Sequence, residues 1–368
     1  MSILTLEGLS KNFGSFAAVK DVSMAVQPDE VLCLLGPSGC GKTTTLRMIA
    51  GLESATRGSV AFGDQEVTGL PARQRDVAMA FQFYALYPDL TVAENLVYPL
   101  KAEKATADEC AQRLNRISDI LQLGTILHRH PHQLSEGEKQ RVAVGRCVIR
   151  APNAFLFDEP LSRLDAKLRD EMRGSIRKIL ATLDKPTVIV THDQLEAMTM
   201  GDRIAVMREG KVEQIGRPQD VFDRPCNTFV AGFIGTPQMN LLEGQCKAVS
   251  ETEVILELGG EALVLPGNRF AELTENGEKI TLAFRPRAVS PGHAADVIFE
   301  NAKVVLTENM GAETLVHAEW NDLPIRMLAQ GNCRDVGTCL DLGVSVDALT
   351  LFNRVGLRLA LKSDGGRH

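Results

Sequence analysis

The sequence lacks the features of a membrane-spanning or exported protein. No apolar run in its 368 residues approaches the about 20 residues that a transmembrane helix needs. The first residues, MSILTLEGLSKNFG, lack the cationic segment followed by an apolar segment that marks a secretory signal. We therefore expect a cytosolic protein that associates with a membrane only through partners.

Cysteine pairs and an excess of positive charge are also missing. The eight cysteines include no C-x-x-C pair and several lie inside apolar runs, so we expect reduced, buried thiols rather than disulfides or a metal site. The formal net charge of −7 gives no general attraction to nucleic acid or anionic lipid. The length and the apolar fraction of 44% predict a globular chain of two or three domains.

A phosphate-binding loop is the strongest motif present. Residues 36–44 read GPSGCGKTT, between the apolar run 31–35 and the helix-like segment 46–50. Such a loop holds phosphates with its backbone amides, while Lys42 reaches the β- and γ-phosphates and the Thr43 hydroxyl ligates Mg²⁺. The alternative is a glycine-rich turn that merely joins strand to helix. The nucleotide-binding candidates are Gly36, Pro37, Ser38, Gly39, Cys40, Gly41, Lys42, Thr43 and Thr44.

Polar residues end three further apolar runs, at Gln82, at Asp158 and Glu159, and at His192. Ligands of open α/β sheets bind at the carboxyl ends of the strands. Asp158 therefore suits Mg²⁺ coordination, and Glu159 is placed to polarise a water. His192 can donate a hydrogen bond to a γ-phosphate. Gln82 has two interpretations, a solvated loop residue or a sensor of Mg²⁺ and the γ-phosphate.

Two positions upstream and downstream of these runs are open to more than one interpretation. Phe13 can stack on a nucleotide base or pack in the core beside Phe16. Ser135 and Glu138 form a capping box that opens a helix, inside a stretch of helical spacing from 91 to 150. The free amides of that helix start can also bind an anion.

The order of the motifs resembles that of the ATPase subunits of ABC transporters. Within that order stand an aromatic loop near Phe13, Walker A at 36–43, a glutamine loop at Gln82, the signature LSEGEKQR at 134–141, Walker B at 155–160, LSRLDAK at 161–167 and a switch histidine at His192. The segments FQFYALYPDLTVAENL and VTHDQLEAMTMGDRIAVM are similar to those of importers of sugars and related solutes, the group typified by the maltose importer.

The resemblance implies an α/β P-loop ATPase domain over 1–235, with an antiparallel β subdomain and a helical subdomain at about 88–150. It implies an OB-like (TOBE) domain over 236–368, where short alternating runs and turn residues also predict an all-β barrel. An OB-like barrel suggests nucleic-acid binding. Because Trp320 is the only tryptophan and basic and aromatic residues do not alternate, we expect dimer contact and regulation instead, and no nucleic acid.

The resemblance also implies a homodimer with two composite sites. Each ATP with its Mg²⁺ is expected between Walker A of one subunit and Ser135 and Gly137 of the other. Asp165 is expected to communicate across the dimer. ATP closes the pair and hydrolysis releases it.

The catalytic roles are implied in the same way. Glu159 is expected to be the general base for the attacking water, and His192 to hold the γ-phosphate and the water in line. The metal ligands are expected to be Thr43, Gln82 and Asp158.

The implied partners are two membrane-spanning permease subunits, one docked near residues 83–88, and a solute-binding protein. The chain is then expected at the cytoplasmic face of the inner membrane. The cargo is a sugar or a sugar-like solute, with polyamines, anions or glycerol phosphates as alternatives. A further alternative is a soluble ABC ATPase without a transporter, although such proteins commonly carry two cassettes or a long coiled coil.

Two departures from the family pattern bear on the rate. The usual signature is LSGGQ, whereas this chain has carboxylates at Glu136 and Glu138. A carboxylate beside a phosphate is unfavourable, although Glu138 can still close the capping box. Arg163 stands where an Asn is more usual, and we find no physical account of its effect.

Overall fold

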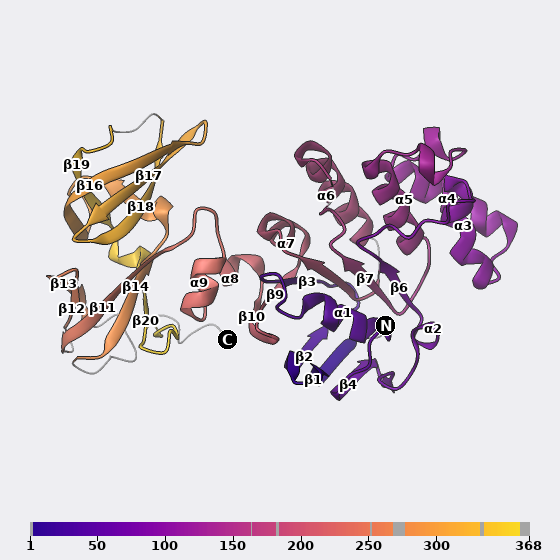
Figure 1. The fold of residues 1–368 in the computed structure, drawn as a ribbon, viewed down its shortest axis with the longest axis horizontal. Helices are drawn as coiled ribbons and strands as arrows, with labels where there is room; N and C mark the ends of the chain where they lie inside the picture. Colours follow the sequence, from indigo (N-terminus) through magenta and orange to yellow (C-terminus); the bar gives the residue numbers. More distant parts are fainter. Residues whose placement is uncertain are drawn as a thin grey trace. The chain divides into compact units, whose positions relative to one another are not determined.

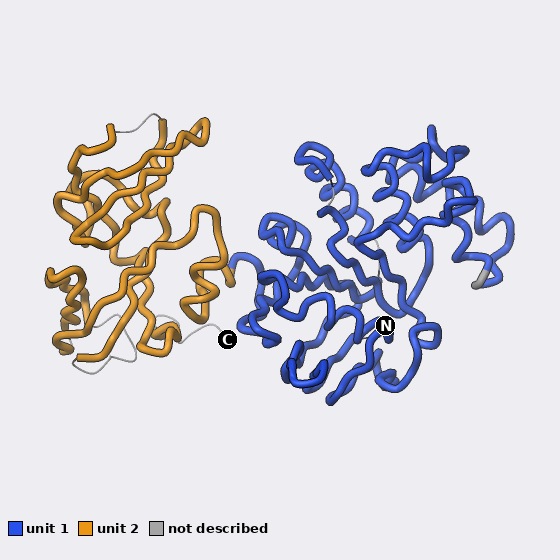
Figure 2. The backbone as a smooth tube through the Cα atoms, viewed as in Figure 1, with its two compact units in different colours: residues 1–219 blue, residues 220–368 orange. Residues whose placement is uncertain are grey.

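The computed structural model describes residues 3–162, 164–181, 184–250, 252–267, 277–331 and 335–360. Arg163 lies outside these residues. The chain forms two compact units, residues 1–219 and 220–368 (Figure 2). The predicted domain boundary at 235/236 stays a prediction.

The second unit begins ahead of that predicted boundary because Arg285 holds the segment from 220 to 235. Its guanidinium donates to the carbonyl oxygens of Phe222 at 2.6 Å and of Ala231 at 3.5 Å, and also to that of Ile234. Burial lowers the pKa of Arg285 to about 10. Two short helices lie in this region, α8 (Pro218–Asp223) and α9 (Thr228–Phe233).

A six-stranded sheet forms the centre of the first unit (Figure 1). Its order is β10-β9-β3-β8-β7-β6, and all neighbours are parallel except β10 and β9. Strands β3, β7 and β8 are buried along their whole length, which explains their continuous apolar runs. The strands are β3 (Val31–Leu35), β6 (Val77–Ala80), β7 (Ala154–Asp158), β8 (Thr187–Thr191), β9 (Arg203–Arg208) and β10 (Lys211–Gly216).

An antiparallel sheet of order β2-β1-β4-β5 shares its core with the central sheet. Leu4 of β1, Leu34 of β3 and Ile49 of α1 belong to one buried cluster. The predicted antiparallel subdomain is therefore confirmed. The elements are β1 (Leu4–Phe13), β2 (Phe16–Val26), β4 (Arg57–Phe62), β5 (Gln65–Glu66) and α1 (Lys42–Ala50).

Three helices form the predicted helical subdomain, at the right of Figure 1. Helices α3 (Val92–Ala102), α4 (Ala107–Ile120) and α5 (Glu136–Val148) each begin with a capping box, at Thr91, Thr106 and Ser135. The remaining helices of this unit are α2 (Ala72–Arg75), α6 (Ala166–Leu180) and α7 (Gln194–Met200). Within the described ranges, no helix is long and apolar enough to cross a bilayer.

The second unit is all-β, as predicted. Two five-stranded antiparallel sheets have the orders β13-β12-β11-β14-β20 and β15-β19-β16-β17-β18. They share one core in which the ring of Phe299 lies 5.5 Å from that of Phe284 and 5.0 Å from that of Trp320. The strands are β11 (Asn240–Val249), β12 (Glu253–Leu258), β13 (Glu261–Pro266), β14 (Lys279–Phe284), β15 (Val289–Pro291), β16 (Val297–Asn309), β17 (Glu313–Trp320), β18 (Leu323–Gln330), β19 (Cys339–Val344) and β20 (Thr350–Phe352).

The single tryptophan makes the stability of this unit measurable by itself. Ile325 is fully buried in the same core as Trp320, so Ile325→Val removes one methylene and leaves a small void. We expect a loss of about 0.5–1.5 kcal/mol in the free energy of unfolding. Urea unfolding followed by Trp320 fluorescence measures it. An unchanged midpoint would show that Ile325 does not support this core.

Candidate active site

The loop between β3 and α1 is shaped to admit an anion. Gly41 caps α1 with φ of 103°, and a Cβ there would lie 2.5 Å from the carbonyl oxygen of Ala18. Gly39 also has a positive φ, 79°. Both positions favour glycine because of their positive φ. The turn that they form places the free amides at the start of α1 next to the loop. The exposed residues are Pro37, Ser38 and Gly39, the half-buried ones Thr43 and Thr44, and the buried ones Gly36, Cys40, Gly41 and Lys42.

Lys42 adds a buried positive charge to this loop. Its ammonium nitrogen donates to the carbonyl oxygens of Gly36, at 2.8 Å, and of Pro37, at 2.9 Å. The lysine is only 6% exposed. Because the ammonium binds carbonyl oxygens of the loop itself, a phosphate that enters the loop meets a cation already in place.

Thr43 and Asp158 form the predicted metal pair. The Thr43 hydroxyl, at the start of α1, donates to Oδ1 of Asp158, at the end of β7, over 3.0 Å. Burial raises the pKa of the Asp158 carboxyl, and the hydrogen bond from Thr43 opposes this shift. Hydroxyl and carboxylate oxygens are the ligands that Mg²⁺ prefers, so the pair fits this ion. In the described part of the chain, no hydrogen bond joins Gln82 to either residue; its amide donates to the Glu159 carboxylate instead.

Asp158→Asn is expected to raise the stability of the metal-free protein. The folded state holds the Asp158 proton more tightly than the unfolded chain does, so ionisation of this carboxyl at neutral pH disfavours the fold. An asparagine side chain does not ionise, so this free-energy cost disappears, and its carbonyl oxygen can still accept the hydrogen bond from the Thr43 hydroxyl. We expect a higher thermal midpoint with a chelator present at pH 7. The difference should vanish below the ordinary pKa range of carboxyls. A lower midpoint at pH 7 would contradict this.

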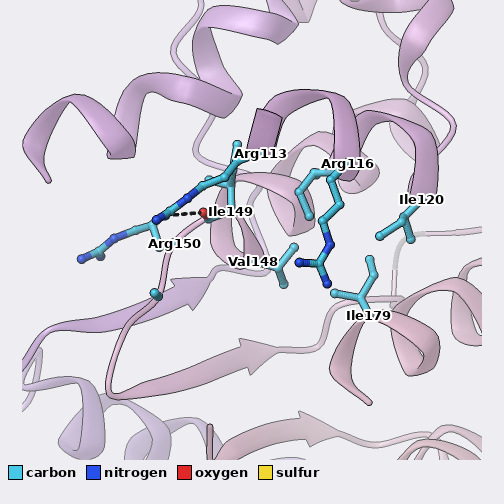
Figure 3. Close-up of a pocket in the computed structure, with 9 residues that line it drawn as sticks. Arg113, Arg116, Ile120, Val148, Ile149, Arg150 and Ile179 are labelled. Carbon is cyan, nitrogen blue, oxygen red and sulfur yellow. Dashed lines mark hydrogen bonds between the residues drawn. The ribbon is translucent and has the colours of Figure 1, made fainter. Parts of the chain in front are cut away.

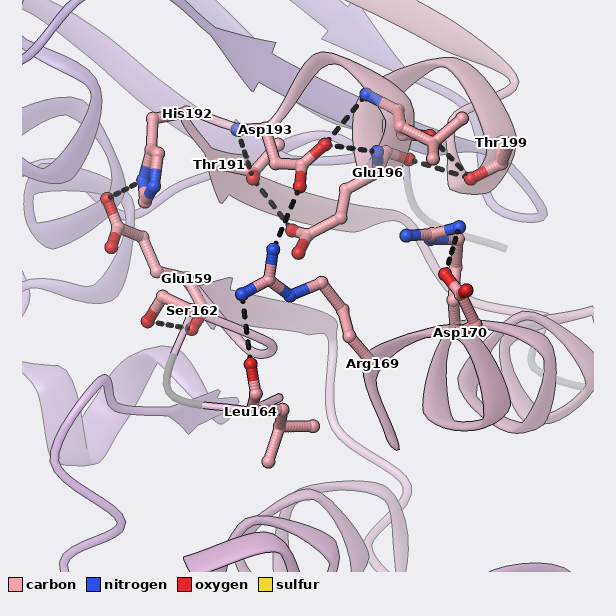
Figure 4. Close-up of polar contacts among 12 residues, drawn as sticks. Glu159, Ser162, Leu164, Arg169, Asp170, Thr191, His192, Asp193, Glu196 and Thr199 are labelled. Atoms are coloured by element: carbon pink, nitrogen blue, oxygen red, sulfur yellow. Dashed lines mark hydrogen bonds and ion pairs between the residues drawn. The ribbon is translucent and has the colours of Figure 1, made fainter. Parts of the chain in front are cut away.

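Glu159 is where the three predicted catalytic residues meet. Nε2 of Gln82 donates to one carboxylate oxygen of Glu159 at 2.9 Å. Nδ1 of His192 lies 3.1 Å from the other carboxylate oxygen, as Figure 4 shows. Glu159 has φ of 51°, a conformation that non-glycine residues rarely adopt. Its N–H donates to the carbonyl of Val190 at 2.9 Å, which holds the turn. Such strain is common at functional sites.

This arrangement suits proton abstraction from a water. A carboxylate accepts a proton, and an adjacent imidazole and amide can orient a water and a phosphate oxygen. The His192 side chain is 56% exposed and the Glu159 side chain 19% exposed, so the glutamate is largely shielded from solvent while the imidazole is open to a ligand.

Sequence reasoning missed two residues beside this site, Glu196 and Arg169. Glu196 is 2% exposed and accepts a hydrogen bond from the Thr191 hydroxyl at 2.7 Å. Its one sequence signal is its place three residues after Asp193, the N-cap of α7. Arg169 contacts Asp193 across the chain, a contact that no local pattern announces.

Phe13 is not a core residue. It is 47% exposed, and the neighbouring Phe16 is 62% exposed, so the core-packing alternative for Phe13 is wrong. The Lys11 ammonium lies 4.9 Å from the centre of the Phe13 ring. The base-stacking interpretation stays a prediction.

The signature stretch begins with the predicted capping box. Ser135 caps α5, and its N–H donates to the Glu138 carboxylate at 2.7 Å, which confirms the capping box. Gly137 is buried against the side chain of Leu168. Asp165 caps α6. Across the described ranges, no hydrogen bond joins Ser135, Gly137 or Asp165 to residues 36–44.

A separate cavity of about 190 Å³ lies between α4, the end of α5 and α6 (Figure 3). None of the motif residues lines it. Two of its arginines already have carboxylate partners, because Arg113 pairs with Glu103 and Arg150 pairs with both Glu103 and Asp76. The cavity is therefore not the phosphate site.

The comparisons with known proteins agree with this geometry. Residues 19–162 match the family model described as ABC transporter. The trehalose/maltose import ATP-binding protein MalK of Thermococcus litoralis is 45% identical over 86% of this chain and 88% of its own length. The sn-glycerol-3-phosphate import ATP-binding protein UgpC of Ruegeria pomeroyi is 45% identical over 87% of each chain.

A solved structure agrees as well. The dimeric ATP-binding cassette MJ0796, bound to ADP and Pi, is 29% identical with a TM-score of 0.53, over 58% of this chain and 98% of that one. The resemblance predicted from the motifs is thus confirmed: the chain belongs to the ABC transporter family, among its ATP-binding proteins.

Proposed function

We propose that this chain hydrolyses ATP to energise a binding-protein-dependent importer of a sugar or a sugar-like solute. The observation that carries the proposal is the meeting of Gln82 and His192 at the Glu159 carboxylate, next to the Thr43–Asp158 pair. Lys42 and the loop amides bind the phosphates, and Thr43 and Asp158 hold Mg²⁺, which neutralises charge on the transferred phosphoryl group. Glu159 takes the proton of the attacking water, His192 orients it, and Gln82 senses the metal.

The active form is a homodimer with composite sites. Ser135 and Gly137 of one subunit complete the ATP site of the other, Asp165 communicates across the interface, and Phe13 stacks on the base. Among the described residues, Ser135, Gly137 and Asp165 form no hydrogen bond to residues 36–44 of the same chain, which supports a site completed by a second copy, as does the dimeric form of MJ0796. An isologous pair of such surfaces gives two identical sites.

The partners are two permeases and a solute-binding protein, with the chain at the cytoplasmic face of the membrane. Aromatic side chains gather where a permease helix would dock: Phe83 is 68% exposed and Tyr87 42% exposed. The second unit then serves dimer contact and regulation rather than nucleic-acid binding.

The cargo has one specific alternative. Relatives of equal identity are named for trehalose/maltose import and for sn-glycerol-3-phosphate import. Residues that contact the cargo lie in the partner proteins, so a glycerol phosphate or another non-sugar solute requires no change in this chain.

Co-purification tests the proposal. The chain, tagged at its C-terminus, is isolated from gently solubilised native membranes and its partners are identified by mass spectrometry. Two multi-span permeases and a secreted binding protein support the importer. Ribosomal or DNA-repair partners without a permease would overturn the transport assignment.

Glu138→Gln is expected to tighten ATP binding in the composite site. The amide keeps the capping-box acceptor but removes a negative charge from beside the phosphates, worth about 1 kcal/mol or about fivefold in KM for ATP. Glu94→Gln is the matched control, because Glu94 closes the same capping box on α3. Equal KM values in the two variants would show that the Glu138 carboxylate does not face the nucleotide.

A further inference from the structure

Arg169, on α6, joins two loops that carry site residues. Its Nη2 donates to the carbonyl oxygen of Leu164 at 2.9 Å, and its Nη1 lies 3.4 Å from Oδ2 of Asp193 (Figure 4). Leu164 directly precedes Asp165, and Asp193 directly follows His192. One guanidinium therefore bridges the segment that leads to Asp165 and the turn that carries His192.

The Asp193 turn is fixed on both sides of His192. Oδ1 of Asp193 accepts from the N–H groups of Leu195 and Glu196, at 2.8 and 3.1 Å, and so caps α7. The N–H of Asp193 donates to the Thr191 hydroxyl at 3.0 Å. The two oxygens of this carboxylate therefore make different contacts: Oδ1 caps α7, and Oδ2 pairs with Arg169.

Glu196 is a third charged residue of this network. Burial and the negative charge of Asp193 raise the pKa of the Glu196 carboxyl, while the hydrogen bond from Thr191 and the nearby cations Arg169 and Arg173 oppose that shift. Arg169 therefore contacts the Asp193 carboxylate and the Leu164 carbonyl oxygen, and its charge also acts on the Glu196 carboxylate. Its Nε is buried and has no hydrogen-bond partner among the described residues, so its contacts are made through the planar terminal fork.

We propose that Arg169 is a positioning residue that links the Asp165 segment to the His192 turn. When a second subunit binds at Asp165, this link changes the position of the His192 imidazole beside the Glu159 carboxylate. The proposal rests on the proposed function, because it takes Asp165 as the residue at the dimer interface. A shift of the Leu164–Asp165 segment moves the Arg169 guanidinium. The guanidinium in turn displaces Asp193, and this reorients the adjacent imidazole. Arg169 itself touches neither ATP nor water.

Steady-state ATP hydrolysis by the full chain tests this with four variants. Arg169→Gln removes the bridge from one end. Asp193→Asn removes the charge at the other end but keeps an N-cap acceptor for α7. The third is the double variant. Lys178→Gln, which removes an exposed positive charge from the same helix, is the matched control.

Both single variants are expected to lower kcat by a similar factor, between about 2-fold and about 100-fold, the range of couplings within one side-chain network. KM for ATP should change little, because the phosphate loop is untouched. The Hill coefficient should fall toward 1, and the double variant should lose no more than the worse single variant. Lys178→Gln should match the parent.

The outcomes separate the two proposals. Parental kcat in Arg169→Gln, or losses that multiply in the double variant, would overturn the positioning role. Glu159→Gln, measured under the same conditions, tests the proposed function. If it hydrolyses ATP normally, the assignment of the general base fails, whatever the Arg169 variants show.

The lysine in Arg169→Lys can donate to only one of the two acceptors, so the kcat of this variant should lie between those of the parent and Arg169→Gln. If Arg169→Gln does not fold, the kcat values of Asp193→Asn and Arg169→Lys test the positioning role, and parental values in both would overturn it.

Discussion

Glu159→Gln is expected to bind ATP like the parent and to hydrolyse it about 10²- to 10⁴-fold more slowly, the range that a general base contributes. The amide has nearly the same shape and can still contact Gln82 and His192, which now flank the carboxylate. What it cannot do is accept a proton from water. Binding is measured with a fluorescent ATP analogue, and turnover by phosphate release.

Glu171→Gln is the control for that measurement, since Glu171 is an exposed carboxylate on α6. It should turn over at the parental rate. Near-normal turnover in Glu159→Gln would mean that another group takes the proton, and Asp158 would become the remaining carboxylate of the site.

Lys42→Ala is expected to weaken ATP binding by about 10- to 150-fold. A hydrogen bond to a charged group contributes about 1.5–3 kcal/mol, and Lys42 is the buried cation of the phosphate loop. Its removal also frees the carbonyl oxygens of Gly36 and Pro37, which the ammonium now holds. Calorimetric titration with ATP and Mg²⁺ gives the Kd.

The exposed Lys178 provides the comparison. Lys178→Ala removes the same charge from the whole molecule and should leave the Kd unchanged. A parental Kd in Lys42→Ala would show that the loop amides bind the phosphates unaided.

Much of the site could be predicted from the sequence because parallel strands meet at one edge of the sheet. Asp158 ends β7 and lies within hydrogen-bond distance of Thr43, at the start of the helix after β3. His192 follows β8 and reaches Glu159 in the same way. Buried strands leave long apolar runs, so their polar ends stand out in the sequence.

Other parts could not be predicted, for two physical reasons. The left-handed turn at Glu159 and the bridge from Arg169 to Asp193 are set by three-dimensional packing rather than by local pattern. Phe13 was ambiguous because strand residues alternate between faces, and only the folded hairpin shows which face is exposed.

The most direct test of the proposed mechanism is the oligomeric state of Glu159→Gln in analytical ultracentrifugation, with and without ATP and Mg²⁺. In the proposed homodimer, Ser135 and Asp165 of one copy complete a site in the second, so the variant should self-associate more tightly with ATP than without it. Adding Ser135→Arg should abolish this gain. A self-association that ATP does not strengthen would contradict the composite site.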